Sequence, residues 1–186
     1  MNERLAKIKL LAMDVDGTLT DGSMVFLDGH QIKTFNVLDG LGMRLAMNHG
    51  LKIAWITGNT SDSVTERAKT IGITDVYQGA RFKTEALTDV AAKYGLIKEE
   101  IAYIGDDLND IPAYALSGVA FAVKNAAYEI KDRADITTQK CGGAGAVREA
   151  IEIILKSQGE WDAAVNSFLK ELEKEEKQKV GPEAVA

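Results

Sequence analysis

Two aspartates stand two positions apart in the segment DVDGT, residues 14–18, directly after an apolar run. Carboxylates held this close repel each other unless a cation or a shared proton relieves the repulsion. Asp14 and Asp16 therefore have the chemistry to bind a hard cation such as Mg²⁺ through oxygen, while one carboxylate attacks phosphorus and the other moves a proton. An Asp-Gly turn that caps a helix is the structural alternative for this segment taken alone.

Three later segments also place polar side chains directly after apolar runs. Residues 57–59, Thr-Gly-Asn, offer a hydroxyl and backbone amides that can hold phosphate oxygens, or they form an ordinary turn. Lys83 begins a helical pattern, a place where a lysine is usually solvated. The segment GDDLND, residues 105–110, brings further carboxylates that can bind a cation or cap a helix, namely Asp106, Asp107 and Asp110.

Short β-rich apolar runs alternate with segments of helical periodicity along the chain. This alternation predicts an α/β fold with a mostly parallel, doubly wound (Rossmann-like) sheet and helices on both faces. Ligands of such sheets bind beyond the carboxyl ends of the strands, so the polar segments should meet at one edge. The predicted strands are residues 8–13, 51–56, 75–78, 101–104, 119–123 and 134–137, and the helices between them are 41–48, 61–71, 83–94, 109–115 and 126–132.

One segment interrupts the alternation. Asp28 and Gly29, between short apolar stretches, predict a β-hairpin within residues 23–36, directly after the first strand. The hairpin has more apolar side chains than it can bury alone, so we expect it to pack on a partner or over a site.

The end of the chain differs in character from the rest. We expect one domain over residues 1–160, which ends with an amphipathic helix at 146–156. Residues 161–186 are predicted to be a charged C-terminal helix and tail, disordered from residue 180.

Composition excludes several classes of protein. A chain of 186 residues with 46% hydrophobic residues can bury a core as one domain, and its single cysteine, Cys141, agrees with a reducing compartment. It contains no secretory signal and no run of about 18 apolar residues, so we expect a cytoplasmic protein without membrane contact. The net charge of −6, without a basic cluster, argues against nucleic-acid binding and reflects either solubility or aspartates gathered at a cation.

The order D-x-D-G-T, T-G, K, G-D-D-x-x-D from Asp14 to Asp110 resembles the haloacid dehalogenase superfamily of phosphotransferases. The resemblance implies that Asp14 is the nucleophile and Asp16 the general acid of an aspartyl-phosphate mechanism. It also implies that Thr57 and Lys83 bind the phosphoryl group, with Mg²⁺ held by Asp14, the backbone carbonyl of Asp16, and Asp106. Asp107 and Asp110 would orient the waters on the metal and Lys83.

The sequence has no room for the separate cap domain that many members of this superfamily carry. The segments DVDGTLTDG, FNVLDGLGMR, ERAKTIGI, VYQGARFK, AYIGDDLND and GGAGAVRE resemble the 3-deoxy-D-manno-octulosonate 8-phosphate phosphatases over about residues 8–165. The resemblance implies a homotetramer built on the hairpins, with a tail, beginning at residues 157–169, that reaches a neighbouring site. It also implies substrate contacts by Asp16, Asn36, Val37, Leu38, Asp39, Gly40, Arg44, Gly58, Asn59, Arg67 and Lys83.

The sequence departs from this family at three positions. Leu38, Asn59 and Ala144 stand where the family often has arginine, so guanidinium groups that can pair with a sugar-acid carboxylate are missing. We expect a Mg²⁺-dependent phosphomonoesterase for a phosphorylated sugar acid, first of all the octulosonate 8-phosphate of lipopolysaccharide precursor synthesis. A phosphatase for a nine-carbon sugar acid or another small metabolite, and a non-catalytic module that binds a phosphorylated ligand, are the alternatives.

Overall fold

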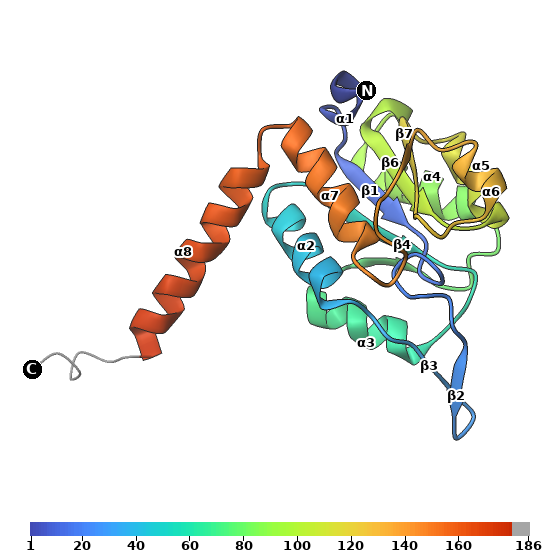
Figure 1. The fold of residues 1–186 in the computed structure, drawn as a ribbon, viewed down its shortest axis with the longest axis horizontal. Helices are drawn as coiled ribbons and strands as arrows, with labels where there is room; N and C mark the ends of the chain where they lie inside the picture. The colour runs from blue at the N-terminus through green and yellow to red at the C-terminus, as the bar shows by residue number, and fades with distance from the viewer. Residues whose placement is uncertain (180–186) are drawn as a thin grey trace, which may run out of the picture.

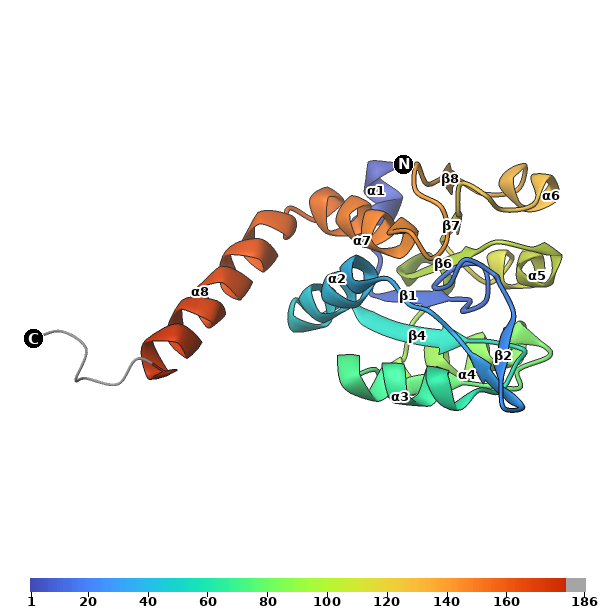
Figure 2. The same cartoon turned by 60° about the horizontal axis from the view of Figure 1, so that its bottom comes forward.

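The computed structural model describes residues 1–179, and at its centre lies a six-stranded sheet (Figures 1 and 2). Every neighbouring pair of strands is parallel. The chain starts in the middle, builds outwards on one side and then returns to the other side of the first strand, which confirms the predicted doubly wound fold. The strand order is β5 (Asp75–Tyr77), β4 (Lys52–Ile56), β1 (Leu10–Met13), β6 (Ile101–Gly105), β7 (Val119–Ala122) and β8 (Ile136–Thr137).

The central strands are apolar on both faces because helices cover both faces. All residues of β1 and β6 are buried, and the large side chains of Trp55, Tyr103 and Phe121 are fully enclosed. Burial on both sides explains why these strands show continuous apolar runs rather than alternation. The core therefore holds the carboxyl ends of β1, β4 and β6 in fixed register, and the polar segments follow from these ends.

Helices form a layer on each side of the sheet (Figure 1). Right-handed crossovers put the helices that follow β1 and β4 on one face and those that follow β5, β6 and β7 on the other. The first face carries α2 (Val37–Asn48), α3 (Asp62–Ile71) and α7 (Ala146–Ser157), with the short α1 (Asn2–Leu5) against α7, and the second carries α4 (Lys83–Tyr94), α5 (Ile111–Tyr114) and α6 (Tyr128–Lys131). Two short 3₁₀ turns, Lys98–Glu100 and Leu108–Asp110, flank β6.

The predicted hairpin is present and is antiparallel. Its strands are β2 (Val25–Leu27) and β3 (His30–Ile32), and Asp28 and Gly29 both have positive φ, 50° and 81°. Positive φ at both central positions is what a two-residue type I′ turn requires. The hairpin extends from the edge of the molecule at the carboxyl ends of the strands (Figure 1), and the described residues contain no cap domain.

Several predicted boundaries differ from the structure. α2 begins at Val37 rather than at residue 41, because the Asn36 side chain accepts a hydrogen bond from the Leu38 amide at 2.8 Å and caps the helix there. The predicted helix at 109–115 is a 3₁₀ turn followed by one short helix with a proline in its first turn.

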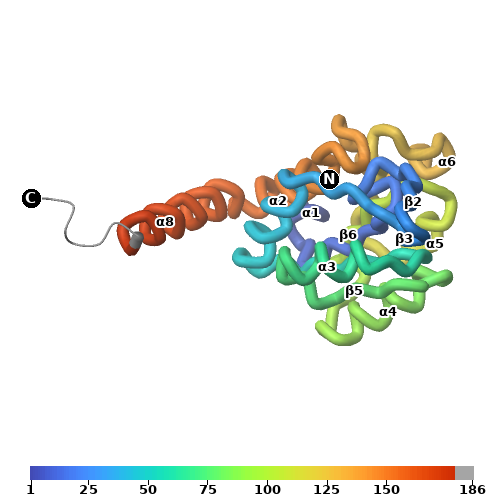
Figure 3. Tube along the Cα trace, turned by 90° about the horizontal axis from the view of Figure 1, so that it is seen from below, coloured from blue at the N-terminus to red at the C-terminus, as the bar shows by residue number. Residues whose placement is uncertain are grey.

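Helix α8 (Trp161–Lys179) leaves the body of the protein (Figures 1 and 3). Its start is anchored, because Ala164 is buried and the Trp161 ring lies under the Arg148 guanidinium at 4.8 Å. The tail predicted to be disordered, residues 180–186, lies outside the described residues. Within residues 1–179, no helix combines the length and apolar character needed to cross a bilayer.

Candidate active site

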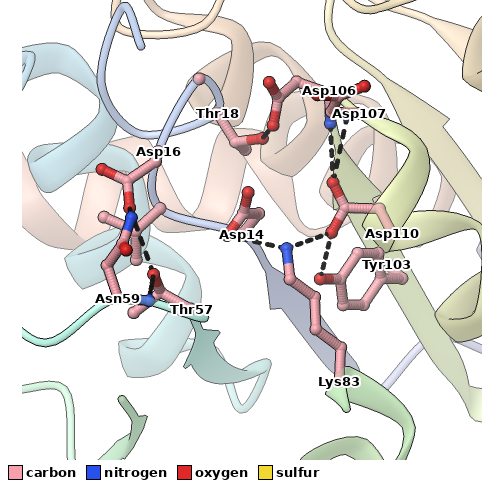
Figure 4. Close-up of polar contacts among 12 residues, drawn as sticks. Asp14, Asp16, Thr18, Thr57, Asn59, Lys83, Tyr103, Asp106, Asp107 and Asp110 are labelled. Atoms are coloured by element: carbon pink, nitrogen blue, oxygen red, sulfur yellow. Dashed lines mark hydrogen bonds and ion pairs between the residues drawn. The ribbon is translucent and has the colours of Figure 1, made fainter. Parts of the chain in front are cut away.

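At the carboxyl ends of β1 and β6, a lysine lies between two buried aspartates, one from the loop after each strand (Figure 4). Lys83, the first residue of α4, places its Nζ 2.9 Å from Asp14 Oδ1 and 2.5 Å from Asp110 Oδ1. The three side chains are nearly inaccessible, with exposed fractions of 1%, 6% and 0%. Burial alone would lower the pKa of Lys83, but the charges of Asp110 and Asp14 outweigh it and raise that pKa, so the lysine stays charged.

Asp110 holds this arrangement together. Its Oδ1 also accepts a hydrogen bond from the Tyr103 hydroxyl at 2.7 Å, and its Oδ2 accepts from the amides of Asp106 at 3.0 Å and Asp107 at 3.3 Å. Both oxygens are thus engaged by donors from three parts of the chain. Asp110 therefore orients Lys83 and the loop after β6.

Asp14, Asp106 and Asp110 form an acidic cluster in which one carboxylate oxygen of each lies within 4.8 Å of the others. Burial raises the pKa of Asp14 to about 6, and the charge of Asp110 adds to this while Lys83 opposes it. Burial also raises the pKa of Asp106 to about 8, together with the charges of Asp14 and Asp110. Among residues 1–179, Lys83 is the one cation that offsets these charges, so the cluster has both the oxygen donors and the excess negative charge that suit a divalent cation such as Mg²⁺.

Gly17 allows the loop after β1 to approach this cluster. Its φ is 87°, and a Cβ at this position would lie 2.0 Å from Asp106 Oδ2. The neighbouring Thr18 hydroxyl donates to Asp106 Oδ1 at 3.3 Å. A glycine directly after Asp16 is therefore required by the close contact between the two carboxylate loops.

We expect the metal-free protein to lose thermal stability as pH rises from about 5 to 8. Asp14 and Asp106 have folded-state pKa values of about 6 and about 8, above the ~4 of an unfolded aspartate. The folded state therefore binds more protons in this range, and stability falls as they leave. Thermal unfolding in EDTA should show a fall in Tm on the order of 5–10 °C between these pH values.

Mg²⁺ provides the control for this measurement. A saturating concentration should remove most of the pH slope, because the cation offsets the charges that the protons had neutralised. Asp39, whose pKa burial raises to about 6, contributes a part of the slope that Mg²⁺ leaves in place. A slope that Mg²⁺ does not change at all would contradict a cation site at Asp14 and Asp106.

Asp16 lies on the other side of the loop, beside the end of β4. Its Oδ2 accepts hydrogen bonds from the Thr57 hydroxyl at 3.2 Å and the Asn59 amide at 2.9 Å, and its Oδ1 accepts from Lys33 Nζ. Partial burial acts to raise the pKa of Asp16, but these hydrogen bonds and the Lys33 charge outweigh it and lower that pKa. The predicted Thr57, Gly58 and Asn59 segment thus meets the first strand's carboxylates, as the topology requires.

These residues surround a cavity of about 530 Å³. It opens at the carboxyl edge of the sheet, where the switch in strand order leaves a crevice between β1 and its neighbours. Its lining is formed by Asp14, Asp16, Thr57, Gly58, Asn59, Arg81, Asp106, Asp107 and Asn109.

The residues predicted to bind substrate from α2 and α3 lie outside this lining. Val37 and Leu38 are exposed at 75% and 53%. Asp39 is buried, and its Oδ1 accepts a hydrogen bond from the Arg148 amide at 2.7 Å, so it caps the start of α7.

Arg67 packs across the start of α2. A Cβ on Gly40 would lie 2.4 Å from its terminal nitrogen, and its buried Nε has no hydrogen-bond partner among the described residues. Arg44 is exposed on α2. The Asn36 amide donates to the Gly143 carbonyl at 3.3 Å. Substrate contacts by this group stay a prediction.

Sequence reasoning does not single out Lys33, Arg81 or Asn109. Lys33 follows the apolar Ile32, so alternation predicts that the lysine faces solvent, yet its side chain is 1% exposed while Ile32 is 39% exposed. The position of Arg81 could have indicated a site residue, because it lies in a loop after a strand and two residues before Lys83.

The sheet order, the acidic cluster and the buried lysine together define a haloacid dehalogenase-like hydrolase. The family model of that description matches residues 53–151 of this chain.

Closer relatives narrow the assignment. The 3-deoxy-D-manno-octulosonate 8-phosphate phosphatase KdsC of Escherichia coli K12 is 42% identical over 159 residues, which is 84% of each chain. KdsC of Haemophilus influenzae is 38% identical over 86% of this chain and 89% of its own. The crystal structure of the Moraxella catarrhalis phosphatase of the same name, in complex with magnesium ion, phosphate ion and KDO, is 41% identical, with a TM-score of 0.86 over 90% of this chain and 97% of that one. This chain belongs to the KdsC family of phosphatases.

Proposed function

We propose that this protein is a Mg²⁺-dependent phosphomonoesterase that hydrolyses 3-deoxy-D-manno-octulosonate 8-phosphate. The observation that carries the proposal is the cavity floor, where the Asp14 carboxylate lies 2.9 Å from the buried Lys83 ammonium and beside Asp106. A phosphate ester needs this combination, because phosphoryl transfer depends mainly on positioning and on neutralising charge. The match to KdsC relatives supports the substrate.

In the proposed first step, Asp14 is the nucleophile. A carboxylate oxygen of Asp14 forms a bond to phosphorus while the bond from phosphorus to the sugar oxygen breaks. Asp16 gives its proton to the departing sugar oxygen. Thr57, Asn59 and Lys33 now hold the pKa of Asp16 low, and a phosphoryl group would compete for these donors, which returns Asp16 towards its protonated form.

In the second step, water attacks the phosphorus of the aspartyl-phosphate. Asp16, now ionised, accepts the proton of the water, and the bond from phosphorus to the Asp14 oxygen breaks to release inorganic phosphate. Lys83 and the Thr57 hydroxyl hold the phosphoryl oxygens in both steps.

The residues that would hold Mg²⁺ are the carboxylates of Asp14 and Asp106 and the backbone carbonyl of Asp16. When bound, it supplies positive charge to the phosphoryl oxygens. Asp110 is an orienting residue rather than a ligand in this assignment, because both its oxygens are taken by Lys83, Tyr103 and backbone amides. Asp107 lines the cavity and would orient the waters on the metal.

The sugar end of the substrate is proposed to contact residues around the start of α2. The start of this helix is exposed at Val37 and Leu38. The proposed set is Asn36, Val37, Leu38, Asp39, Gly40, Arg44, Gly58, Asn59 and Arg67.

A panel of phosphate esters tests this function. Purified protein with Mg²⁺ should release phosphate from the octulosonate 8-phosphate with a kcat/KM at least tenfold above that for a sugar phosphate without a carboxylate. A tenfold preference for a nine-carbon sugar acid, or for a non-acidic ester, would overturn the substrate while leaving the phosphatase. Binding without any turnover would favour the non-catalytic alternative.

We also propose that the working form is a homotetramer in the cytoplasm. The hairpin exposes its apolar side chains while it buries Lys33, and such a surface is expected to be covered by protein. The tetramer would close a site that no cap domain covers within residues 1–179. The exposed fractions of Met24, Val25, Phe26, Leu27 and Ile32 are 63%, 52%, 64%, 62% and 39%.

Phe26→Glu is expected to dissociate this assembly. A charge in the middle of an apolar interface removes buried apolar area, and burying that charge costs desolvation free energy. Light scattering at micromolar concentration should give a tetramer for the wild type and a smaller species for the variant. The matched control is Ile97→Glu, which places the same charge on another side chain exposed at 61% and should leave the tetramer intact. A monomeric wild type would refute the proposal.

A further inference from the structure

One cation lines the cavity, and it lies in the loop before α4. Arg81 is exposed, and among residues 1–179 its guanidinium takes part in no ion pair and no hydrogen bond to another side chain or to the backbone. Its one neighbour of note is the Phe82 ring, whose centroid lies 5.7 Å from the guanidinium carbon. The guanidinium of Arg81 therefore has N–H donors available to a ligand that enters the cavity.

The loop that carries Arg81 is held firmly against the site. The Ala80 amide donates to the Thr57 carbonyl at 2.9 Å, and the Gly79 amide donates to the Asn59 carbonyl at 3.1 Å. One residue before them, Gln78 accepts a hydrogen bond from the Ser61 amide at 2.7 Å. The backbone of Arg81 is therefore fixed to the same loop that carries Thr57, and two residues later Lys83 enters the floor.

The positions of the two cations, Lys83 and Arg81, suit them to bind different parts of a ligand. Lys83 is buried beside Asp14, so it serves the phosphoryl group at the floor. Arg81 is exposed, so it can reach only the outer part of a bound ester. Besides Arg81, the charged residues of the lining are the four carboxylates of Asp14, Asp16, Asp106 and Asp107, which repel an acidic ligand.

We propose that Arg81 determines specificity by binding the carboxylate of the phosphorylated sugar acid. A guanidinium presents two parallel N–H donors that match a carboxylate, and the Phe82 ring beside it limits the orientations it can take. This inference rests on the proposed phosphatase function, and it names the group of the substrate that the enzyme recognises besides the phosphate.

The test compares the octulosonate 8-phosphate with the same ester whose C1 carboxylate is masked as a methyl ester. The wild type should prefer the free acid, and Arg81→Gln should reduce the ratio of the two kcat/KM values at least tenfold, mainly through KM. Arg81→Lys keeps the positive charge but loses the two parallel N–H donors, so its ratio of kcat/KM values should lie between those of the wild type and Arg81→Gln. The matched control is Arg133→Gln, which removes a guanidinium 51% exposed outside the cavity lining and should leave the ratio unchanged.

Two outcomes would overturn the inference. If the wild type does not prefer the free acid, the carboxylate is not recognised. If Arg81→Gln loses activity equally on the free acid and on its methyl ester, Arg81 contacts the phosphoryl group instead. If neither ester is hydrolysed, the proposed function fails first. Calorimetry with the free acid 3-deoxy-D-manno-octulosonate then decides separately, because Arg81→Gln must weaken its binding at least tenfold while inorganic phosphate binds as before.

Discussion

Asp14→Asn is expected to lower kcat by a factor on the order of 10⁴ or more. The amide keeps the size of the side chain but is not a nucleophile, so no aspartyl-phosphate forms. Phosphate release from the octulosonate 8-phosphate with Mg²⁺ measures the loss. Because asparagine can deamidate to aspartate, Asp14→Ala should be measured beside it and should be equally inactive.

The same variant should remain folded, which separates chemistry from stability. Burial and the charge of Asp110 raise the pKa of Asp14 to about 6, so ionised Asp14 is unfavourable in the metal-free cluster. Removing its charge should leave the Tm in EDTA at or above that of the wild type. Asp132→Asn, a change to an exposed aspartate, is the control and should retain full activity. Full turnover by Asp14→Ala would refute the assigned nucleophile.

The fold could be predicted because its main determinants are local in the sequence. Continuous apolar runs such as LLAM and IAWI indicate strands buried on both faces, and all six predicted strands are present in the parallel sheet. Asp28 and Gly29 indicate the hairpin because few other residues accept positive φ in both positions. The carboxyl-end rule then places Asp14, Thr57 and Asp106 at one edge.

The orientation of individual side chains could not be predicted in the same way. A lysine beside an apolar hairpin residue is usually solvated, yet Lys33 is 1% exposed because it turns inward to Asp16, while Ile32 is 39% exposed. The attraction of a distant carboxylate is not visible in a local pattern. Asp39 is a carboxylate, the type of side chain that binds ligands, yet it contacts the backbone of α7. That helix lies about 100 positions away in the sequence, and only tertiary packing brings it near.

The ion pairs of Lys83 with Asp14 and Asp110 also could not be predicted from a local sequence pattern. The sequence places Lys83 at the start of a helix, where a lysine is usually solvated, and nothing nearby in the chain reveals that Asp110 will lie 2.5 Å from it. The sheet order explains the pairing, since α4 follows β5 and the chain then crosses over to β6, whose loop carries Asp110.

Lys83→Met is expected to have the largest combined effect on stability and activity. Methionine fills the same space but leaves Asp14 and Asp110 buried without their cation, at exposed fractions of 6% and 0%. Breaking a buried ion pair from one side costs about 3–5 kcal/mol, so the Tm in EDTA should fall by roughly 10 °C. Loss of a preorganised positive group at the phosphoryl oxygens should also lower kcat by about 10²–10³.

Two controls, Mg²⁺ addition and a substitution of Lys93, test whether the loss of stability in Lys83→Met comes from the acidic cluster. Saturating Mg²⁺ should raise the Tm of Lys83→Met by more than it raises the Tm of the wild type, because the cluster of the variant has the larger uncompensated charge. Lys93→Met removes another lysine 2.5 Å from an aspartate, Asp75, but Lys93 is 50% exposed and water screens this pair, so its loss should lower the Tm much less. An equal loss of Tm in the two variants, or no greater gain from Mg²⁺ in Lys83→Met, would show that Lys83 does not balance the acidic cluster.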